Sequence, residues 1–243
     1  MCGRYSQLRS WSDLVRLYKL TADQTPLNLP PRYNIAPTQD VPVVRFTQGG
    51  GGRELVLLRW GLVPSWAKDV AGGYKMINAR AETIAEKPAF RHAFQQRRCL
   101  VVADGFYEWA KTPTGRKQPY FITVTGDQLF AFAGLWESWN SLGGERIQSC
   151  TIAVTQANDI LRPIHDRMSA ILNGDHFDSW LDTKAPLAEA KALLRPYPGA
   201  MTLFPVSSRV NAVRNDDPDC LAPMDLLSCP VTRPEVPYNH PAG

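Results

Sequence analysis

The sequence lacks any hydrophobic run that resembles a membrane span or a secretion signal. A membrane helix needs about 18 to 20 consecutive apolar residues, and a signal peptide has an apolar core near its start. Here the first turns of the chain instead carry charges, at Arg4, Arg9, Asp13 and Arg16. We therefore expect a cytoplasmic protein without a membrane partner.

Cysteine is scarce and has no paired spacing. The chain has five cysteines and no C-x-x-C pair, whereas a disulfide framework or a zinc site is recognised by an even count or by close pairs. We therefore expect neither a metal nor another cofactor. The cysteines are Cys2, Cys99, Cys150, Cys220 and Cys229.

The chain also has only a small excess of positive charge. Lysine and arginine number 27 against 23 acidic residues, which gives a net charge of +4. A nucleic-acid-binding domain is usually more basic, so any contact with DNA must be local. The 243 residues, 44% of them hydrophobic, are sufficient for a large core.

Long helices are disfavoured, because 20 prolines and 17 glycines interrupt the chain. Hydrophobic runs at 41–46 and 54–60 flank a glycine tract and predict a hairpin. Residues 79–98 have a helical pattern that is broken at Pro88. Further strands are predicted at 99–103, 119–125, 129–135, 147–155 and 202–206, and further helices at 10–20, 174–181 and 187–194.

Because these strands follow one another through short turns, we expect an α+β fold in a single domain. Its main part should be an antiparallel, barrel-like sheet with peripheral helices. The domain is expected to span residues 1–230, and residues 231–243 are expected to form a flexible tail.

The chain begins Met1-Cys2-Gly3-Arg4, so removal of Met1 would make Cys2 the first residue. Such a residue has two nucleophiles, an α-amine with a reference pKa of about 7.7–8.0 and a thiol with one of about 8.5. We expect both to be partly deprotonated at neutral pH. The amine condenses with an aldehyde, and the thiol then closes a thiazolidine ring on the imine. Taken alone, however, a chain that begins Met-Cys is better explained by a cysteine that has no catalytic role.

Several short sequence motifs follow Met1-Cys2-Gly3-Arg4 along the chain. They closely resemble the SOS response-associated peptidase (SRAP) family, whose members recognise abasic sites in DNA. The resemblance extends to about residue 215 and has two departures, since the family usually has proline where this chain has Val102 and Ser169. The strings are MCGR at 1–4, RYNIAP at 32–37, RWGLVPSWA at 59–67, INARAET at 77–83, ADGFYEW at 103–109 and IHDRM at 164–168.

Three polar residues in these strings each allow two interpretations. Glu108 lies in an apolar, aromatic string, so it is either a proton carrier of raised pKa or a glutamate on the outer face of a strand. His165 is either a general acid or base, or a structural histidine. Asn78 either positions an amine or a sugar oxygen, or caps a helix that starts at Ala79.

The resemblance implies that Cys2, Asn78, Glu108 and His165 converge in one pocket. It further implies an abasic-site sensor that forms a thiazolidine crosslink with single-stranded DNA after loss of Met1 and so protects the site. Opening of the closed sugar needs a proton on O4′, which is the role expected of His165. Glu108 is expected to move protons at the amine and the departing hydroxyl. Asn78 is expected to hold the Cys2 terminus.

Five residues near these positions are candidates for contact with DNA. Arg4, Arg80 and Arg167 can each pair with a phosphate beside the captured sugar. Trp66 and Trp109 can stack on unpaired bases. The expected partner is single-stranded DNA that contains an abasic site, bound by a monomer.

Two other functions remain open on the sequence. Class II glutamine amidotransferases also begin Met-Cys-Gly, so an N-terminal-nucleophile hydrolase is an alternative, although this chain has no spare length for a synthase domain. The peptidase in the family name is expected to act mainly in removing Met1. A non-catalytic DNA-binding module is the third possibility, and it would make Cys2 dispensable.

Overall fold

The computed structural model describes residues 2–21, 24–47, 51–126, 129–141 and 143–224. Strands form most of its regular structure, and the helices are short. The strands are β1 (Tyr5–Gln7), β2 (Arg32–Ile35), β3 (Asp40–Phe46), β4 (Arg53–Trp60), β5 (Asn78–Arg80), β6 (Arg98–Val102), β7 (Gly105–Lys111), β8 (Lys117–Val124), β9 (Phe130–Asn140), β10 (Arg146–Gln156), β11 (Arg167–Ser169), β12 (Ile171–Asn173) and β13 (Met201–Pro205). The helices are α1 (Trp11–Tyr18), α2 (Arg91–Gln96), α3 (Phe177–Leu181) and α4 (Leu187–Leu193), with 3₁₀ turns η1 (Ala71–Lys75), η2 (Gly174–His176), η3 (Ser208–Asn211) and η4 (Pro218–Cys220).

Five strands of the larger sheet pair in a closed circle. β10 pairs with β4, β4 with β3, β3 with β6, β6 with β9, and β9 again with β10. Every one of these pairs is antiparallel except β10 with β4. Beyond the circle, β5 and β11 pair with opposite edges of β10, and β12 pairs with β9. The barrel-like sheet that the sequence predicts is therefore present.

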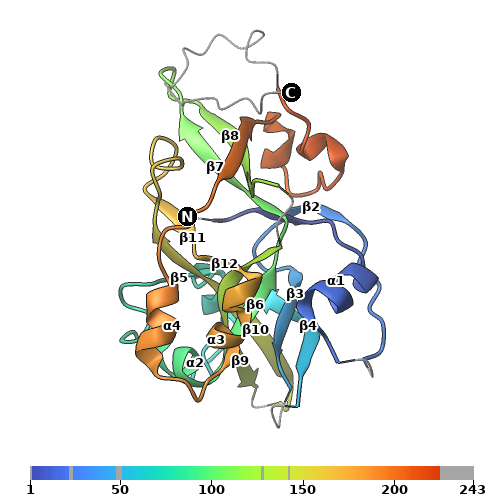
Figure 1. The fold of residues 1–243 in the computed structure, drawn as a ribbon, viewed down its shortest axis with the longest axis vertical. Helices are drawn as coiled ribbons and strands as arrows, with labels where there is room; N and C mark the ends of the chain where they lie inside the picture. The colour runs from blue at the N-terminus through green and yellow to red at the C-terminus, as the bar shows by residue number, and fades with distance from the viewer. Residues whose placement is uncertain (1, 22–23, 48–50, 127–128, 142, 225–243) are drawn as a thin grey trace.

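The smaller sheet has the strand order β13-β8-β7-β1-β2 and is antiparallel throughout. In Figure 1, β7 and β8 lie above the strands of the larger sheet, and the dark blue β1, also part of the smaller sheet, crosses the molecule beneath them. Side chains from both sheets share one buried cluster, in which the Tyr5 ring meets Trp60 and Phe132 edge-on, at centroid distances of 5.3 and 5.8 Å. This packing holds the first strand against the larger sheet.

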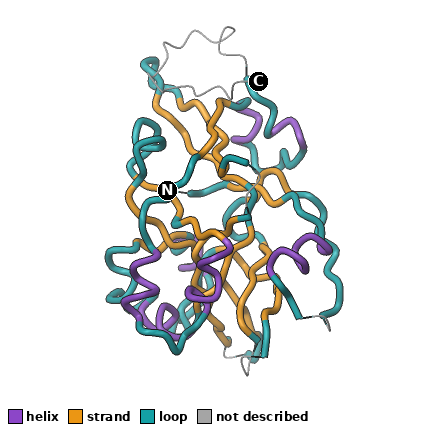
Figure 2. Tube along the Cα trace, viewed as in Figure 1, coloured by secondary structure: helices purple, strands orange, loops and turns teal. Residues whose placement is uncertain are grey.

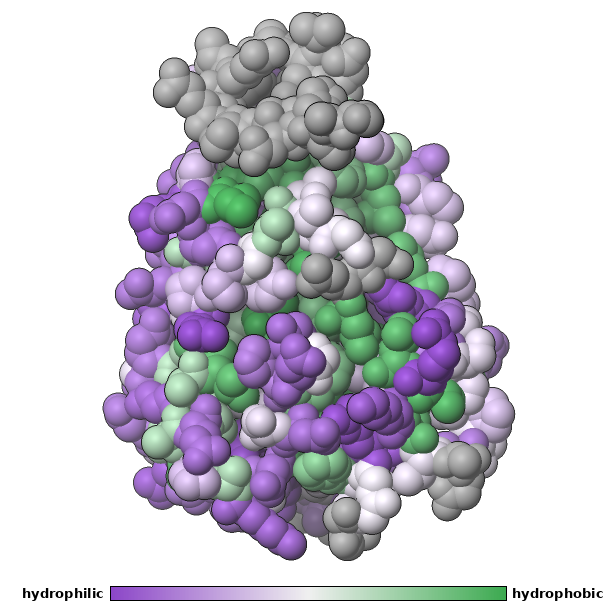
Figure 3. Space-filling view, in the orientation of Figure 1, coloured by the Kyte–Doolittle hydropathy of each residue, from purple (hydrophilic) through white to green (hydrophobic). Residues whose placement is uncertain are grey.

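The helices cover the outside of the strands (Figure 2). Ser10 begins α1 through a capping box with Asp13, and the inner face of that helix buries Leu14 and Tyr18. Tyr18 stacks on Phe177 of α3 at 5.2 Å. Figure 3 shows hydrophobic side chains in the middle of one face, with hydrophilic ones along its left and lower margins. No helix among the described residues is long and apolar enough to cross a membrane.

The predicted α+β class with mainly antiparallel sheets is confirmed, and so is the hairpin, which is formed by β3 and β4. The prediction of a helix over residues 79–98 is wrong for most of its length. Residues 78–80 pair with β10 as strand β5, residues 81–90 form turns, and only α2 is helical. The open edge of β10 therefore outweighs local helical propensity. Residues 48–50 of the predicted hairpin tip at 48–52 lie outside the described residues, and so does the predicted tail at 231–243.

Candidate active site

Cys2 lies just before β1, and its side chain is fully buried. Its thiol donates a long hydrogen bond of 3.8 Å to the Arg4 carbonyl. Its own carbonyl accepts a 2.8 Å hydrogen bond from the side-chain amide of Asn78. Because Asn78 starts β5, which is paired to β10, this bond ties the start of the chain to the larger sheet. The alternative of Asn78 as a helix cap is wrong, since no helix starts there.

Glu108 approaches the same site from the smaller sheet. It lies on β7 opposite Tyr120, and only 3% of it is exposed, so it does not lie on the outer face of the strand. Burial raises the pKa of its carboxyl, while the positive charge of His165 acts in the opposite direction. A buried carboxyl of raised pKa near a histidine is suited to proton transfer.

The Cys2 thiol differs from the sequence-based expectation that it is partly ionised. Burial first, and then the negative charge of Glu108, raise its pKa from 9.0 to about 12. The expectation was wrong because it used the value for an exposed thiol. At neutral pH the resting thiol is protonated, and it needs help to become a nucleophile.

His165 lies in the loop before β11. Its Nδ1 is 2.9 Å from the backbone nitrogen of Arg167 and 2.9 Å from a carboxylate oxygen of Asp166. One nitrogen cannot accept from the amide and donate to the carboxylate at once. Nδ1 accepts from the Arg167 amide when it carries no hydrogen, and it donates to Asp166 when it does. With the Nδ1 hydrogen held on Asp166, the protonated ring can release its Nε2 proton to a substrate and remain as a neutral imidazole.

The structure packs two of the predicted DNA-contacting residues against each other. The Arg4 guanidinium donates to the side-chain oxygen of Asn34 at 2.8 Å and to the Val210 carbonyl at 2.7 Å. It also lies 5.9 Å from the centre of the Trp109 ring. The indole of Trp109 in turn donates to Asn211 at 2.8 Å. Arg4 and Trp109 thus have internal partners and contribute to the fold whether or not they bind DNA.

The other three predicted contact residues are more open. Arg80 is exposed and has no ion pair among the residues that the structure describes. Arg167 forms a 2.6 Å ion pair with Glu82, whose carboxylate also feels the charge of Arg80. Trp66 is 64% exposed on a turn. These three residues are therefore the ones that can accept a ligand without loss of a core contact.

Sequence reasoning missed Ser169, the last residue of β11. It is fully buried, and its hydroxyl lies beside the Cys2 thiol, whose pKa it lowers. The sequence signal was present only as a departure from the usual family pattern. Nothing in the sequence places residues 2 and 169 side by side.

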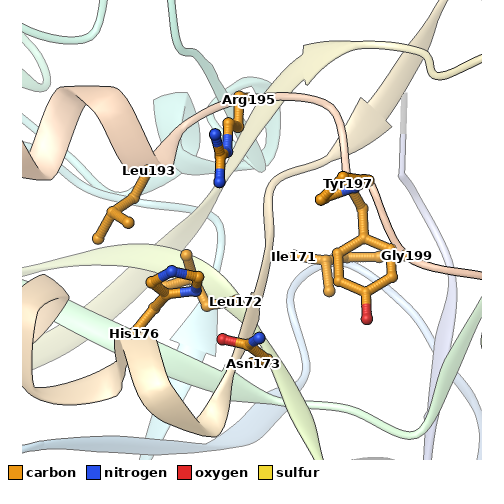
Figure 4. A pocket seen from close by; sticks show the side chains of 9 residues that line it. Ile171, Leu172, Asn173, His176, Leu193, Arg195, Tyr197 and Gly199 are labelled. Carbon is orange, nitrogen blue, oxygen red and sulfur yellow. The ribbon is translucent and has the colours of Figure 1, made fainter.

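A separate hollow of about 260 Å³ lies between β12, η2 and the segment after α4. Figure 4 shows the side chains of Asn173, His176 and Arg195 directed to the same space, with Tyr197 at its edge. None of the four residues predicted to converge in one pocket lines this hollow. In the described part of the chain, no group of three or more acidic, histidine or cysteine residues could hold a metal ion.

Comparisons with known proteins identify the family of this chain. The family model of the SOS response associated peptidase (SRAP) matches residues 1–213. The abasic site processing protein YoqW of Bacillus subtilis (strain 168) is 40% identical over 223 residues, which cover 91% of this chain and 99% of the relative. The abasic site processing protein HMCES of Gallus gallus is 37% identical over 81% of this chain and 67% of the relative.

A crystal structure of a protein from Bacteroides thetaiotaomicron has the same fold, with a TM-score of 0.82 at 26% identity over 92% of this chain and 100% of that one. The fold and the site together define an α+β protein in which Cys2 is buried near Asn78 and Glu108. The chain belongs to the SOS response-associated peptidase family.

Proposed function

We propose that this chain captures abasic sites in single-stranded DNA through a covalent bond between Cys2 and the sugar. The observation that carries the proposal is the meeting of three groups from separate elements. The Cys2 carbonyl is held by Asn78 at 2.8 Å, and the Cys2 thiol lies within the electrostatic reach of Glu108. The names of the relatives, abasic site processing proteins, support the same substrate.

The proposed reaction starts once Met1 is removed and the Cys2 amine is exposed. We propose that this removal of Met1 is the peptidase activity to which the family name refers. An abasic sugar exists mostly as a closed hemiacetal, so a proton must reach O4′ as the ring opens, and His165 supplies it from Nε2. The amine then adds to the C1′ aldehyde. Glu108 gives a proton to the departing hydroxyl, which leaves as water and yields an iminium ion.

The thiol completes the reaction by adding to C1′ and closing a five-membered thiazolidine ring. Without this step, the imine would either hydrolyse or promote β-elimination and break the strand, as in a lyase. Ring closure thus protects the DNA. The raised pKa of the thiol fits this order, because the amine can act while the thiol is still protonated.

The DNA is proposed to lie over Arg80, Arg167 and Trp66, inside the cell. The two arginines can pair with phosphates beside the captured sugar, and the exposed indole can stack on an unpaired base. The low net charge of +4 fits a short contact of a few phosphates.

Incubation with an abasic-site oligonucleotide tests the proposal. The expected result is a band of higher mass that survives heat and denaturant. An oligonucleotide with a tetrahydrofuran residue is the matched control, because it has no C1′ hydroxyl and cannot open to an aldehyde. Absence of a stable band with the abasic site, on protein that lacks Met1, would refute the proposal. Glutamine hydrolysis in its place would favour the amidotransferase alternative.

A further inference from the structure

Ser169 has a buried hydroxyl without a regular hydrogen bond. The residue ends β11, where it pairs with Val154 of β10, and it is 0% exposed. Its Oγ is buried and has no hydrogen-bond partner of normal geometry. A hydroxyl taken out of water without a partner destabilises the folded protein, so such groups are rare and need an explanation.

The neighbour of this hydroxyl is the Cys2 thiol, which lies in surroundings that oppose its ionisation. The thiol is fully buried and lies near the carboxylate of Glu108. Both conditions favour the neutral sulfur. The Ser169 hydroxyl makes the largest contribution in the other direction. It is thus a donor without a regular partner beside an acceptor that becomes strong only when it loses its proton.

We propose that Ser169 positions and stabilises the Cys2 sulfur during ring closure, by donating its hydroxyl hydrogen to the sulfur as negative charge develops there. The inference rests on the proposed function, since it concerns the thiol step of that reaction. In the resting protein the hydroxyl has no hydrogen bond of normal geometry, and its interaction with the sulfur strengthens as charge develops in the transition state. An interaction that strengthens only in the transition state accelerates the step.

The Cys2 nitrogen and C1′ of the sugar are joined as an iminium ion. The thiol proton passes to the Glu108 carboxylate, and the sulfur electron pair forms the bond to C1′. The π electrons of the C=N bond return to nitrogen, which becomes a neutral amine in the thiazolidine. Ser169 keeps its own proton throughout, and no oxidant or further reactant is needed.

Ser169→Ala should therefore slow only the closure of the thiazolidine ring. The species trapped by borohydride, which reports the imine, should form at the parental rate. The heat-stable adduct should form about tenfold more slowly, as loss of one hydrogen bond to a charged group implies. The rate of Cys2 alkylation at a fixed, mildly alkaline pH, read by mass spectrometry of the N-terminal peptide, should also fall. Ser169→Thr keeps the hydroxyl and should restore both.

Thr151→Val is the matched control. Thr151 on β10 also has a buried hydroxyl without a partner. Its neighbours Cys150 and Ile152 belong to the cluster that contains Cys2, so the alternation of side chains directs Thr151 to the other face of the strand. This variant should leave closure and the rate of Cys2 alkylation unchanged. If Ser169→Ala fails to fold, Ser169→Cys is nearly isosteric, has only a weak donor and carries the same expectation.

Different results would refute the proposed function and the proposed role of Ser169. If the parent forms no heat-stable adduct, the proposed function is wrong. If the parent forms the adduct and the folded Ser169→Ala or Ser169→Cys variant closes the ring at the parental rate with the parental rate of Cys2 alkylation, only the role of Ser169 is wrong. A Ser169→Thr variant that folds but behaves as alanine would also overturn it.

Discussion

The side-chain amide of Asn78 donates a 2.8 Å hydrogen bond to the carbonyl of Cys2, across 76 positions of sequence. This contact connects β5 at the edge of β10 with the chain just before β1. The amine of Cys2 is two bonds from that carbonyl carbon. A fixed carbonyl therefore limits where the amine can lie, and orientation of a nucleophile can account for much of a rate enhancement.

Asn78→Ala should slow adduct formation more than it weakens the fold. Loss of one hydrogen bond should reduce the free energy of unfolding by about 0.5–1.5 kcal/mol. Single-turnover crosslinking should slow by a larger factor than that stability change implies, because the Cys2 terminus loses its anchor. The measurement is a crosslinking time course beside a urea titration. Parental crosslinking kinetics in a folded variant would contradict a positioning role.

The amine and the thiol of Cys2 can be removed separately. Cys2→Ser and Cys2→Ala keep the amine, so an imine trapped by borohydride should still form, while the heat-stable adduct should fall steeply. An uncleavable N-terminal extension keeps the thiol and blocks the amine, so it should abolish both species. Intact mass of the parent should show loss of Met1.

Each alternative expects a different pattern from these variants. A hydrolase should lose glutamine hydrolysis in all three and crosslink in none. A binding module should retain DNA binding in all three and bond to DNA in none. Full stable crosslinking by Cys2→Ala would exclude the proposed chemistry, because an amine and a thiol on one residue would then be unnecessary.

Local sequence patterns identify strands that are neighbours along the chain but not contacts between distant residues. Two hydrophobic runs on either side of a glycine tract predicted the hairpin of β3 and β4, because a turn pairs strands that are neighbours in the sequence. The segment from residue 78 was misread as a helix, since its partner is β10, about 75 positions away. The burial of Cys2 and its contact with Ser169 are likewise products of tertiary packing. For that reason, a local string could nominate Glu108 but could not place it beside Cys2.

Glu108→Gln should change the pH dependence of stability. Burial raises the pKa of this carboxyl above its usual 4.5, so the folded protein holds the proton more tightly than the unfolded chain does. The stability that this group contributes is thus present below pH 4.5 and is lost as the pH rises through the raised pKa. Glutamine cannot ionise. Relative to the parent, the variant should therefore gain free energy of unfolding between acidic and neutral pH.

Urea titrations of both proteins at several pH values measure that difference, and other carboxyl groups cancel because both chains share them. A relative loss of stability with rising pH would contradict the sign. The same variant should crosslink about 10²–10⁴-fold more slowly through loss of proton transfer. Its noncovalent affinity for DNA should hardly change, and an equal loss of both would make Glu108 a structural residue.

Glu82→Gln should strengthen noncovalent binding to single-stranded DNA. The Glu82 carboxylate pairs with Arg167 at 2.6 Å and lies near Arg80, so it competes with phosphate for both cations. Its pKa lies below the usual value, so it is ionised at neutral pH. Because the pair is partly exposed, we expect a several-fold gain in affinity at low salt that shrinks as salt screens the charges.

Fluorescence anisotropy with a tetrahydrofuran-containing oligonucleotide measures this affinity without covalent capture. For the parent, one phosphate contact each by Arg80 and Arg167, at about 0.7 released ions per contact, predicts a log–log salt slope of about −1.4. Glu86→Gln is the matched control, since Glu86 carries the same charge on the same turn but has no ion pair among the described residues. An equal gain in both variants would indicate a general charge effect. No gain in affinity in Glu82→Gln would show that DNA does not pass over Arg80 and Arg167. A salt slope of the parent several times steeper than expected would indicate a longer basic groove than these two arginines provide.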